Sequence, residues 1–348
     1  MKNEFKNKVI LVTGGAGSIG SVIAEELLQY KPKTVRILDI HEFSLYKHER
    51  KHADRKDEVF RYMLGDVRDV ERLKKAMEGV DIVYHAAAYK HVPFCEFNPA
   101  EAVKTNVLGT QNVVEAAIYN KVKKVILIST DKAAHPTGTL GASKLLAEKI
   151  ITAANYHKGG HTPVFSCVRF GNVTMSSGSV IPNFIYQIKN GGPVTVTSSE
   201  MTRFLMSIRQ AAELIFRATE LMSGGEVFVF KMNSVKIEDL ARVIIEEYQH
   251  QSEKEKQKIR IKFTGPRPGE KMHEQLLVDD ESENVVEMKD LLVLLPSVRT
   301  NYKTLHRPHP LETHAKKVDV GRFFSDKCLI SKEELASFVR ENKMMEME

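Results

Sequence analysis

Near its start the chain carries Lys8-Val9-Ile10-Leu11-Val12-Thr13, and Gly14-Gly15-Ala16-Gly17-Ser18-Ile19-Gly20 follows directly. The apolar, β-branched run predicts a buried parallel strand, and the pattern from Ser21 to Gln29 predicts a helix. Glycine allows a tight turn and a close approach of the backbone to a pyrophosphate, and the helix start offers N–H groups to the phosphates. A glycine motif alone is a weak signal, but here the expected elements flank it on both sides. We therefore predict a dinucleotide site with contacts from Gly14, Gly17, Ser18, Ile19 and Gly20.

The acid after the second predicted strand bears on the choice of cofactor. That strand, Thr34 to Leu38, ends in Asp39, which lies 19 residues after Gly20 (39 − 20). The spacing is close to that of a carboxylate that binds the adenosine ribose. A carboxylate there favours NAD, because it would repel the 2′-phosphate of NADP. The alternative for Asp39 is a helix cap.

Two more strands are expected beside the same cofactor. The third, Val59 to Met63, leads to Asp66 and Val67, and Asp66 either faces the adenine or caps the helix of residues 70–77. The fourth, Asp81 to His85, runs into three small residues that would let a cofactor lie against the chain. These three are Ala86, Ala87 and Ala88.

Strands and helices alternate as far as Lys149, and the rhythm changes after Arg169. A long helix is expected from Glu101 to Asn120, with Asn106 fixing the backbone near the active site. We predict an α/β fold, a Rossmann doubly wound parallel sheet with a smaller α+β substrate-binding domain. The expected units are residues 1–172 as the NAD-binding domain with 205–232 packing back on it, 173–204 and 233–296 as the substrate-binding region, and 297–348 as a C-terminal extension.

Polar residues gather where the fifth predicted strand, Lys123 to Ser129, ends. Thr130, Asp131 and Lys132 follow it at once, and ligands bind at the carboxyl ends of the strands in open α/β sheets. Lys144 lies twelve residues after Lys132 (144 − 132), on the first turn of a helix expected from Gly141 to Ala154. The group is either catalytic or a helix cap.

Composition limits the class of protein. The chain has 348 residues, 42% hydrophobic and 28% charged, with a net charge of +6. No apolar run approaches the ~20 residues that span a bilayer, and the charged start leads straight into a strand, so neither a membrane span nor a signal peptide is expected. Three scattered cysteines indicate a reducing cytoplasm and no metal site. The modest positive excess indicates a solvated surface rather than nucleic-acid binding.

Together these motifs resemble a known family. Residues 13–20 resemble the opening of the extended short-chain dehydrogenase/reductases. More narrowly, the chain resembles the nucleotide-sugar 4,6-dehydratases of polysaccharide and flagellin-glycan synthesis, and the resemblance spans about Lys8 to Pro296. The motifs that carry it are His85–Pro93, Ser129–Ala133, Arg169–Val173, Met201–Phe204 and Arg267–Lys271.

The resemblance implies UDP-N-acetylglucosamine 4,6-dehydratase activity with tightly held NAD. Hydride leaves C4 to give a 4-ketone, water is lost across C5–C6, and the hydride returns to C6. By resemblance, Thr130 holds the C4 oxygen, Lys132 removes the C5 proton, Asp131 protonates the leaving hydroxyl and Lys144 binds the nicotinamide ribose. A base must be neutral, so we expect burial or Lys144 to lower the pKa of Lys132.

The resemblance also implies further contacts and partners. Phe170 matches a position beside the cofactor. Arginine recognises phosphate through two hydrogen bonds, so Arg203 and Arg267 are candidates for the anionic end of the substrate. The alternative for each is an ordinary surface arginine. Related enzymes associate, so a homo-oligomer is expected. The residues that match positions near the substrate are Lys90, Asn172, Arg203, Arg267 and Glu270.

One residue departs from the family pattern. Most short-chain dehydrogenases have tyrosine four residues before the active-site lysine, where this chain has Leu140 (144 − 4). Some dehydratases of the family place methionine there, and the change fits a simple 4-epimerase poorly. Two alternatives stay open, a dehydratase or epimerase acting on another nucleotide sugar, and a catalytically silent NAD-binding module.

Overall fold

The computed structural model describes residues 2–160, 162–176, 178–251, 259–267, 269–296 and 309–345. Residues 297–308 and 346–348 of the predicted extension lie outside the described residues, as does Pro268 of the Arg267 motif.

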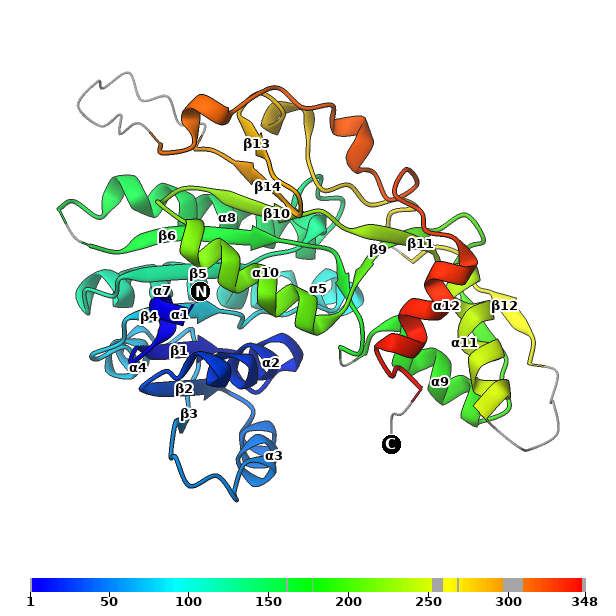
Figure 1. The fold of residues 1–348 in the computed structure, drawn as a ribbon, viewed down its shortest axis with the longest axis horizontal. Coiled ribbons are helices and arrows are strands. Elements are labelled where there is room, and N and C mark those ends of the chain that lie inside the picture. The colour runs from blue at the N-terminus through cyan, green and yellow to red at the C-terminus, as the bar shows by residue number, and fades with distance from the viewer. Residues whose placement is uncertain are drawn as a thin grey trace.

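Within the described residues, nine strands form the main sheet in the order β13-β14-β10-β6-β5-β4-β1-β2-β3 (Figure 1). The strands from β10 to β3 are parallel, and β14 pairs antiparallel with both β10 and β13. The order β3-β2-β1-β4-β5-β6 confirms the predicted doubly wound Rossmann sheet, and the strand order reverses between β1 and β4. The bounds are β1 Val9–Thr13, β2 Thr34–Asp39, β3 Phe60–Leu64, β4 Ile82–His85, β5 Lys124–Ile128, β6 Val164–Arg169, β10 Val227–Phe230, β13 Val285–Glu287 and β14 Leu291–Leu294.

Alternate residues of each strand enter two different cores, because side chains point to opposite faces of a sheet. Ile126 and Ile128 pack on the face covered by α2 and α10, whereas Val125 and Leu127 pack on the face covered by α4, α7 and α8. Both faces are therefore apolar, which explains why the strands read as continuous hydrophobic runs. The helices of this part are α1 Lys2–Phe5, α2 Ser18–Leu27, α3 Glu42–Lys51, α4 Val70–Ala76, α5 Val92–Phe97, α6 Pro99–Ala102, α7 Gly109–Tyr119, α8 Thr139–His157 and α10 Ile208–Leu221, with short helical turns η1 Leu28–Tyr30, η2 Val103–Leu108 and η3 Asp131–Ala133.

Two helices near the site differ from their predicted form. The helix expected over residues 101–120 is divided by the π-helix η2, which carries Asn106. The helix that carries Lys144 begins at Thr139 rather than Gly141, so Lys144 lies on its second turn and not its first. The early start has a physical cause, because the Glu96 carboxylate accepts the Thr139 N–H at 2.6 Å and so caps the helix from outside.

A smaller part lies at the right of Figure 1 and has a core of its own. It contains α9 Val180–Lys189, α11 Ile237–Gln251 and a parallel pair of strands, β8 Val194–Val196 and β12 Ile261–Phe263. Between the two parts runs a second sheet in the order β11-β9-β7. Its strands are β7 Asn172–Val173, β9 Thr202–Met206 and β11 Asn233–Lys236.

Two segments pack in a different part of the protein from the one that the predicted domain boundaries gave them. Residues 285–294, expected in the substrate-binding region, form β13 and β14 and extend the main sheet. The apolar run Leu291–Leu294 is buried in the larger part of the protein, where it pairs antiparallel with β10. The described part of the extension is not separate either, because α12 (Lys332–Glu341) buries Leu335 and Val339 in the core of the smaller part. The remaining short turns are η4 Asp279–Glu281, η5 Glu312–His314 and η6 Val320–Phe323.

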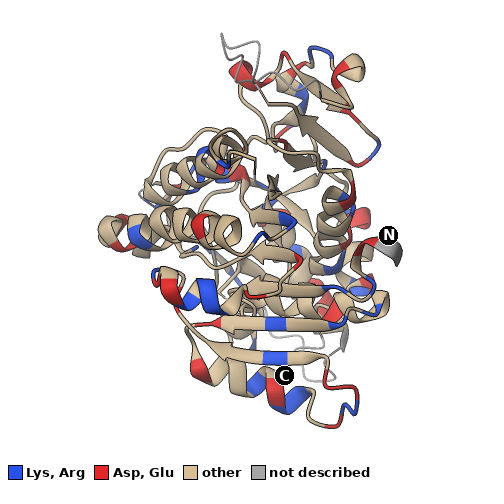
Figure 2. Ribbon diagram, turned by 90° about the vertical axis from the view of Figure 1, so that its left-hand side faces the viewer, with Lys and Arg blue, Asp and Glu red and all other residues tan. Residues whose placement is uncertain are grey.

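Two surface properties complete the description. Lysine and arginine alternate with aspartate and glutamate over the elements seen in Figure 2. Among the described helices, none combines the length and apolar character that a bilayer crossing requires.

Candidate active site

The glycine turn after β1 leaves no room for side chains. Gly14 has a φ of +63°, and a Cβ there would lie 2.7 Å from the Cα of Ala87, which follows β4. A Cβ on Gly20 would lie 2.2 Å from the carbonyl oxygen of Gly14. The turn therefore packs backbone to backbone at the point where the strand order reverses, which is where dinucleotides bind in this fold. Gly17 precedes α2, and no described side chain caps that helix, so its first N–H groups suit a pyrophosphate.

The two acids predicted near the adenosine are not helix caps. His41 caps α3 and Asp69 caps α4, which excludes the cap alternative for Asp39 and for Asp66. Asp39 accepts the Ala16 N–H at 3.1 Å, so its carboxylate lies against the glycine turn. Asp66 forms an ion pair with Arg68 at 2.6 Å. Contacts of Asp39, Asp66 and Val67 with a cofactor stay predictions.

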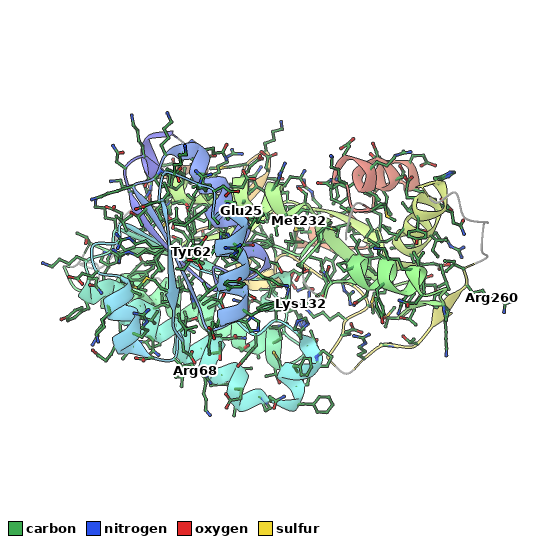
Figure 3. All side chains as sticks on the ribbon, turned by 90° about the horizontal axis from the view of Figure 1, so that it is seen from below. Glu25, Tyr62, Arg68, Lys132, Met232 and Arg260 are labelled. Carbon is green, nitrogen blue, oxygen red and sulfur yellow. The ribbon has the colours of Figure 1, made fainter. Side chains whose placement is uncertain are left out.

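Three predicted catalytic residues form one hydrogen-bonded group at the end of β5. The Thr130 hydroxyl donates to Oδ1 of Asp131 at 2.9 Å, and the Lys132 ammonium donates to the same oxygen at 3.0 Å. Asp131 is fully buried and its Oδ2 has no partner among the described residues. Gly171 passes close by, since a Cβ there would lie 3.0 Å from that oxygen. Lys132 lies where the larger and smaller parts meet (Figure 3).

A fourth residue, the buried acid Glu274, completes this group and was not predicted. Its buried carboxylate lies 3.5 Å from Nζ of Lys132, 3.7 Å from Nζ of Lys271 and 3.9 Å from Nε of Arg203. Glu274 comes three residues after the Arg267–Lys271 motif. The sequence offers no signal that separates it from the many surface acids, because its partners come from β9 and from the end of β5.

These carboxylates decide the charge of Lys132. Burial lowers the pKa of Lys132, but Asp131 and Glu274 raise it by more, so the pKa lies above that of a free lysine. The expected lowering is therefore wrong for Lys132. Burial does lower the pKa of the other lysine, Lys144, to about 8. Nζ of Lys144 donates to the Ile128 carbonyl at 2.6 Å, two residues before Thr130.

A buried polar chain supports the floor of the site. Thr13 bonds His85 at 2.7 Å, His85 bonds Thr110 at 3.1 Å, and the Thr110 hydroxyl donates to the Asn106 carbonyl at 2.7 Å. The Asn106 side chain accepts the Tyr89 N–H at 2.8 Å and donates to the Tyr89 carbonyl at 3.2 Å. Asn106 thus fixes the loop that follows β4, as predicted. Burial lowers the pKa of His85 to about 3, so its ring stays neutral.

The residues predicted near the substrate fall into two groups. Arg203 is 7% exposed and donates to the Thr202 carbonyl at 2.8 Å, so it lies in the Lys132–Glu274 group rather than on a surface loop. Asn172 begins β7, and its side-chain oxygen has no partner among the described residues. Lys90, Arg267 and Glu270 lie on loops outside this group, and Glu270 accepts the Arg267 N–H at 3.2 Å.

Leu140 and Phe170 pack against apolar neighbours. Leu140 is 5% exposed and packs with Cys95, Ala102 and Val92. It therefore places an aliphatic group where a proton acceptor is usual in short-chain dehydrogenases. Phe170 stacks on Phe230 with ring centres 5.2 Å apart, and its contact with a cofactor stays a prediction.

Comparison with known proteins shows relatives over most of the chain. A family model described as polysaccharide biosynthesis protein matches residues 10–296. An uncharacterised membrane protein of Methanocaldococcus jannaschii is 51% identical over 85% of this chain and 88% of its own length. A UDP-N-acetylglucosamine 4,6-dehydratase (inverting) of Campylobacter jejuni is 40% identical over 85% of each chain. A UDP-glucose 4-epimerase of Rickettsia rickettsii is 41% identical over 82% of each chain.

Solved structures agree with the fold. The X-ray structure of Pen from Bacillus thuringiensis has a TM-score of 0.87 and 43% identity, and the match covers 97% of this chain and 98% of that one. More distant structures with NAD and nucleotide sugars, at 20–21% identity, share the fold alone.

Proposed function

We propose that this chain, which belongs to the polysaccharide biosynthesis protein family of extended short-chain dehydrogenase/reductases, is a nucleotide-sugar 4,6-dehydratase. Membership of this family makes the chain an enzyme that modifies nucleotide sugars. We propose UDP-N-acetylglucosamine as its substrate. One observation carries the proposal. Thr130 and Lys132 both bond Oδ1 of Asp131, at 2.9 and 3.0 Å, so a hydroxyl, an acid and an amine meet at one point.

The residues around the glycine turn fit NAD. The close backbone approach at Gly14 and the uncapped start of α2 suit a pyrophosphate, and Asp39 suits a ribose without a 2′-phosphate. The ammonium of Lys144 reaches from α8 to the end of β5, where it would hold the nicotinamide ribose. Bound NAD would supply the hydride acceptor for C4 and the hydride donor for C6.

The Thr130–Asp131 contact supplies the base that Leu140 lacks. Because the Thr130 hydroxyl already donates to Asp131, it can accept the C4 hydroxyl proton while passing its own to the carboxylate. The proton then leaves through Lys132, whose side chain is 24% exposed to solvent. Asp131 would thus be the final acceptor of the C4 hydroxyl proton, a role that the tyrosine has in most short-chain dehydrogenases.

The Asp131–Lys132 pair can perform the elimination without a change in its total charge. Transfer of one proton along the 3.0 Å contact turns the ion pair into a carboxylic acid beside a neutral amine. Lys132 then accepts the C5 proton, and Asp131 gives its proton to the C6 hydroxyl, which leaves as water. Once hydride had returned to C6, Lys132 would return a proton to C5. Its amine would then take up one proton from solvent, which replaces the C4 hydroxyl proton released earlier and restores the ion pair for another cycle.

A 4-epimerase is the second candidate, supported by the Rickettsia relative. Epimerisation needs C4 oxidation and reduction, which the Thr130–Asp131 contact can serve, but it needs neither a base for the C5 proton nor an acid for a C6 hydroxyl. It therefore leaves the amine of Lys132 beside Asp131 without a role at C5 and C6. The site therefore favours the dehydratase.

The test is an incubation of purified protein with UDP-N-acetylglucosamine and other nucleotide sugars, read by mass spectrometry. A dehydratase gives a product lighter by one water, and an epimerase gives an isomer of unchanged mass that chromatography separates. Absence of both products with every sugar, in protein that retains NAD, would support the catalytically silent module instead.

A further inference from the structure

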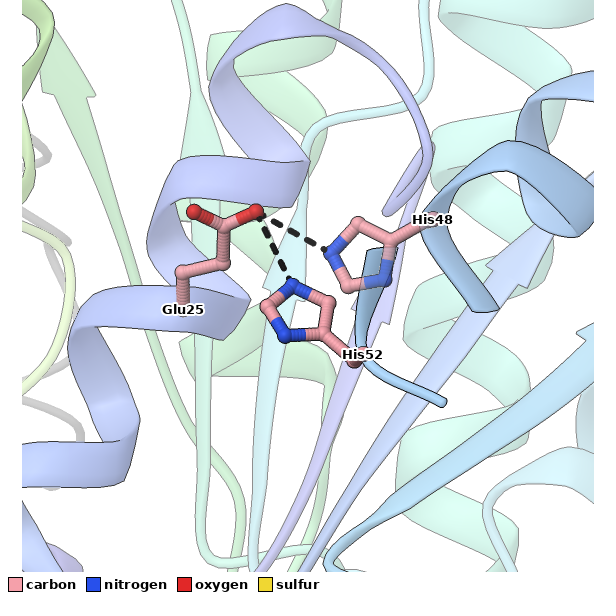
Figure 4. A group of neighbouring side chains, drawn as sticks. All are labelled: Glu25, His48 and His52. Atoms are coloured by element: carbon pink, nitrogen blue, oxygen red, sulfur yellow. Dashed lines mark hydrogen bonds and ion pairs between the residues drawn. The ribbon is translucent and has the colours of Figure 1, made fainter. Parts of the chain in front are cut away.

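Three side chains from two helices converge on one point outside the active site (Figure 4). His48 lies on α3 and His52 directly after it, so the four-residue spacing places both rings on one face of the helix. Glu25 reaches them from α2. Its Oε1 lies 3.2 Å from Nε2 of His52 and 3.6 Å from Nε2 of His48. The three candidate ligand atoms all lie within 4.8 Å of one another.

His48 is left with an unexplained polar atom. It is 6% exposed, and its Nε2 has no hydrogen-bond partner among the described residues. Buried polar groups nearly always have a partner, because leaving one unpaired costs free energy. The other ring nitrogen, Nδ1, bonds the Tyr62 hydroxyl at 3.1 Å. When Nδ1 donates in that contact, the Nε2 lone pair faces Glu25 and His52.

The separations match those of metal ligands. In a tetrahedral site with metal–ligand distances of about 2.0–2.1 Å, neighbouring ligand atoms lie about 3.3–3.4 Å apart. The two measured separations from Glu25, 3.2 and 3.6 Å, fall on either side of that value. Two imidazoles and a carboxylate form a ligand set that suits zinc, and a hydrogen bond from the second ring nitrogen is the usual outer contact of a metal-bound histidine.

We propose that Glu25, His48 and His52 bind a divalent transition-metal ion of the zinc class, with water in the fourth position. The ligands would be Nε2 of each histidine and Oε1 of Glu25, and Tyr62 would orient His48. Glu25 and His52 are partly exposed, so an ion can reach the site from solvent. Tyr62 and Glu25 lie on the same side of the molecule in Figure 3.

One cation competes for this site. Nζ of Lys51 lies 2.7 Å from the same Oε1 of Glu25, and the Lys51 side chain is 62% exposed. An incoming ion would displace this ammonium, which can turn into solvent at little cost. Lys51 therefore weakens metal binding without being a ligand, and its removal separates a metal site from an ion-pair cluster.

The position of the site indicates what the ion would do. α2 begins in the glycine turn, and α3 begins three residues after Asp39. An ion held between them would join the two helices that start at the proposed phosphate and ribose contacts. We therefore expect a structural role that stabilises the adenosine half of the cofactor site rather than a catalytic one.

The test is titration of metal-stripped full-length protein, prepared without a histidine tag, with Co²⁺ and then Zn²⁺. Co²⁺ absorption in the visible region reports tetrahedral binding directly. We expect one Co²⁺ per chain, displaced by Zn²⁺, and a higher midpoint of thermal unfolding with the metal. His48→Gln and His52→Gln should abolish the absorption, Tyr62→Phe should weaken binding about 10- to 100-fold, and Lys51→Met should strengthen it.

The control is His157→Gln, which removes an exposed histidine of α8 and should leave the titration unchanged. Failure of the wild type and of Lys51→Met to bind one Co²⁺ per chain would overturn the proposal. So would full binding by His52→Gln, whose fold is checked by circular dichroism in the absence of metal.

Discussion

Replacing Glu274 with glutamine should change the pH at which the enzyme works. The change keeps the size of the side chain and removes one of the two carboxylates that hold Lys132 as an ammonium. Lys132 would then reach its neutral form at lower pH. The proposed elimination needs one proton on the Asp131–Lys132 pair, because Asp131 gives a proton to the C6 hydroxyl, so loss of the Lys132 proton to solvent marks the basic limb of kcat against pH. That limb should therefore move to lower pH in Glu274→Gln.

The distances give the size of the effect. At an effective dielectric constant of about 20, unit charges 3.5 Å apart, as for Glu274 and Lys132, attract by about 4.7 kcal/mol, and charges 3.0 Å apart, as for Asp131 and Lys132, by about 5.5 kcal/mol. Glu274 thus supplies somewhat less than half of the attraction. Lys132 is 24% exposed, so the net effect should lie between about 1 kcal/mol for an exposed pair and about 3 kcal/mol for a buried one. A value of about 2 kcal/mol corresponds to a roughly thirtyfold change in the acid dissociation constant of Lys132, which moves the basic limb by about 1.5 pH units.

The assay is kcat measured by product mass across the pH range, with NAD content checked in each sample. The matched control is Glu283→Gln, because Glu283 is 63% exposed and pairs with Lys317 on the surface. A basic limb that stays in place in Glu274→Gln, or moves to higher pH, would refute the account of Lys132. Lower kcat at every pH with an unmoved limb would assign Glu274 to positioning alone.

Four further outcomes are expected. Lys132→Ala should abolish product and keep NAD, and wild-type enzyme in heavy water should place deuterium at C5, so unlabelled product would argue against Lys132 as an exchanging base. Thr130→Val should lower kcat on the order of a hundredfold, whereas Leu140→Met should keep most activity, and equal rates in the two variants would reject the Thr130 relay. Asp39→Ala should lose NAD on gel filtration, and NADP in the purified wild type would contradict the interpretation of Asp39. Lys144→Met should raise the unfolding free energy of NAD-free protein at pH 7 by about 2 kcal/mol, because the pKa lowered from 10.5 to about 8 costs about 3 kcal/mol there and the lost hydrogen bond to the Ile128 carbonyl gives back about 1 kcal/mol. This advantage should shrink as the pH rises towards 10, which thermal unfolding across pH would show.

The fold could be predicted because its signals are local. Each apolar run of four to six residues ended in a turn residue or a polar residue, and a helical pattern followed it. Positions that depend on distant partners could not be predicted in this way. Leu291–Leu294 could have packed in either part of the protein, and only its antiparallel pairing with Val227–Phe230 assigns it to the main sheet. The π-helix at Asn106 arises inside a continuous helical pattern and has no local signal.

The same distinction between local and distant signals applies to the candidate site. Thr130, Asp131 and Lys132 could be predicted as a group because they are consecutive at the end of a strand. The sign of the pKa shift of Lys132 could not, because it depends on Glu274, which lies 142 positions later in the chain (274 − 132). The spacing of His48 and His52 is visible in the sequence, but the partner Glu25 comes from another helix, so no linear pattern joins the three.

The C-terminal extension bears on the chemistry although the family model ends at residue 296. Ser325 is fully buried, and its hydroxyl accepts the Glu274 N–H at 2.8 Å and shares a hydrogen bond with the Thr202 hydroxyl at 2.6 Å. Its own N–H donates to the Glu274 carbonyl at 2.8 Å. The backbone on both sides of the Glu274 carboxylate is thus held by residue 325, and the next residue after Thr202 is Arg203, another neighbour of that carboxylate. Because the charge of Lys132 depends on where Glu274 lies, the extension helps to set the protonation state of the proposed base from outside the part of the chain that defines the family.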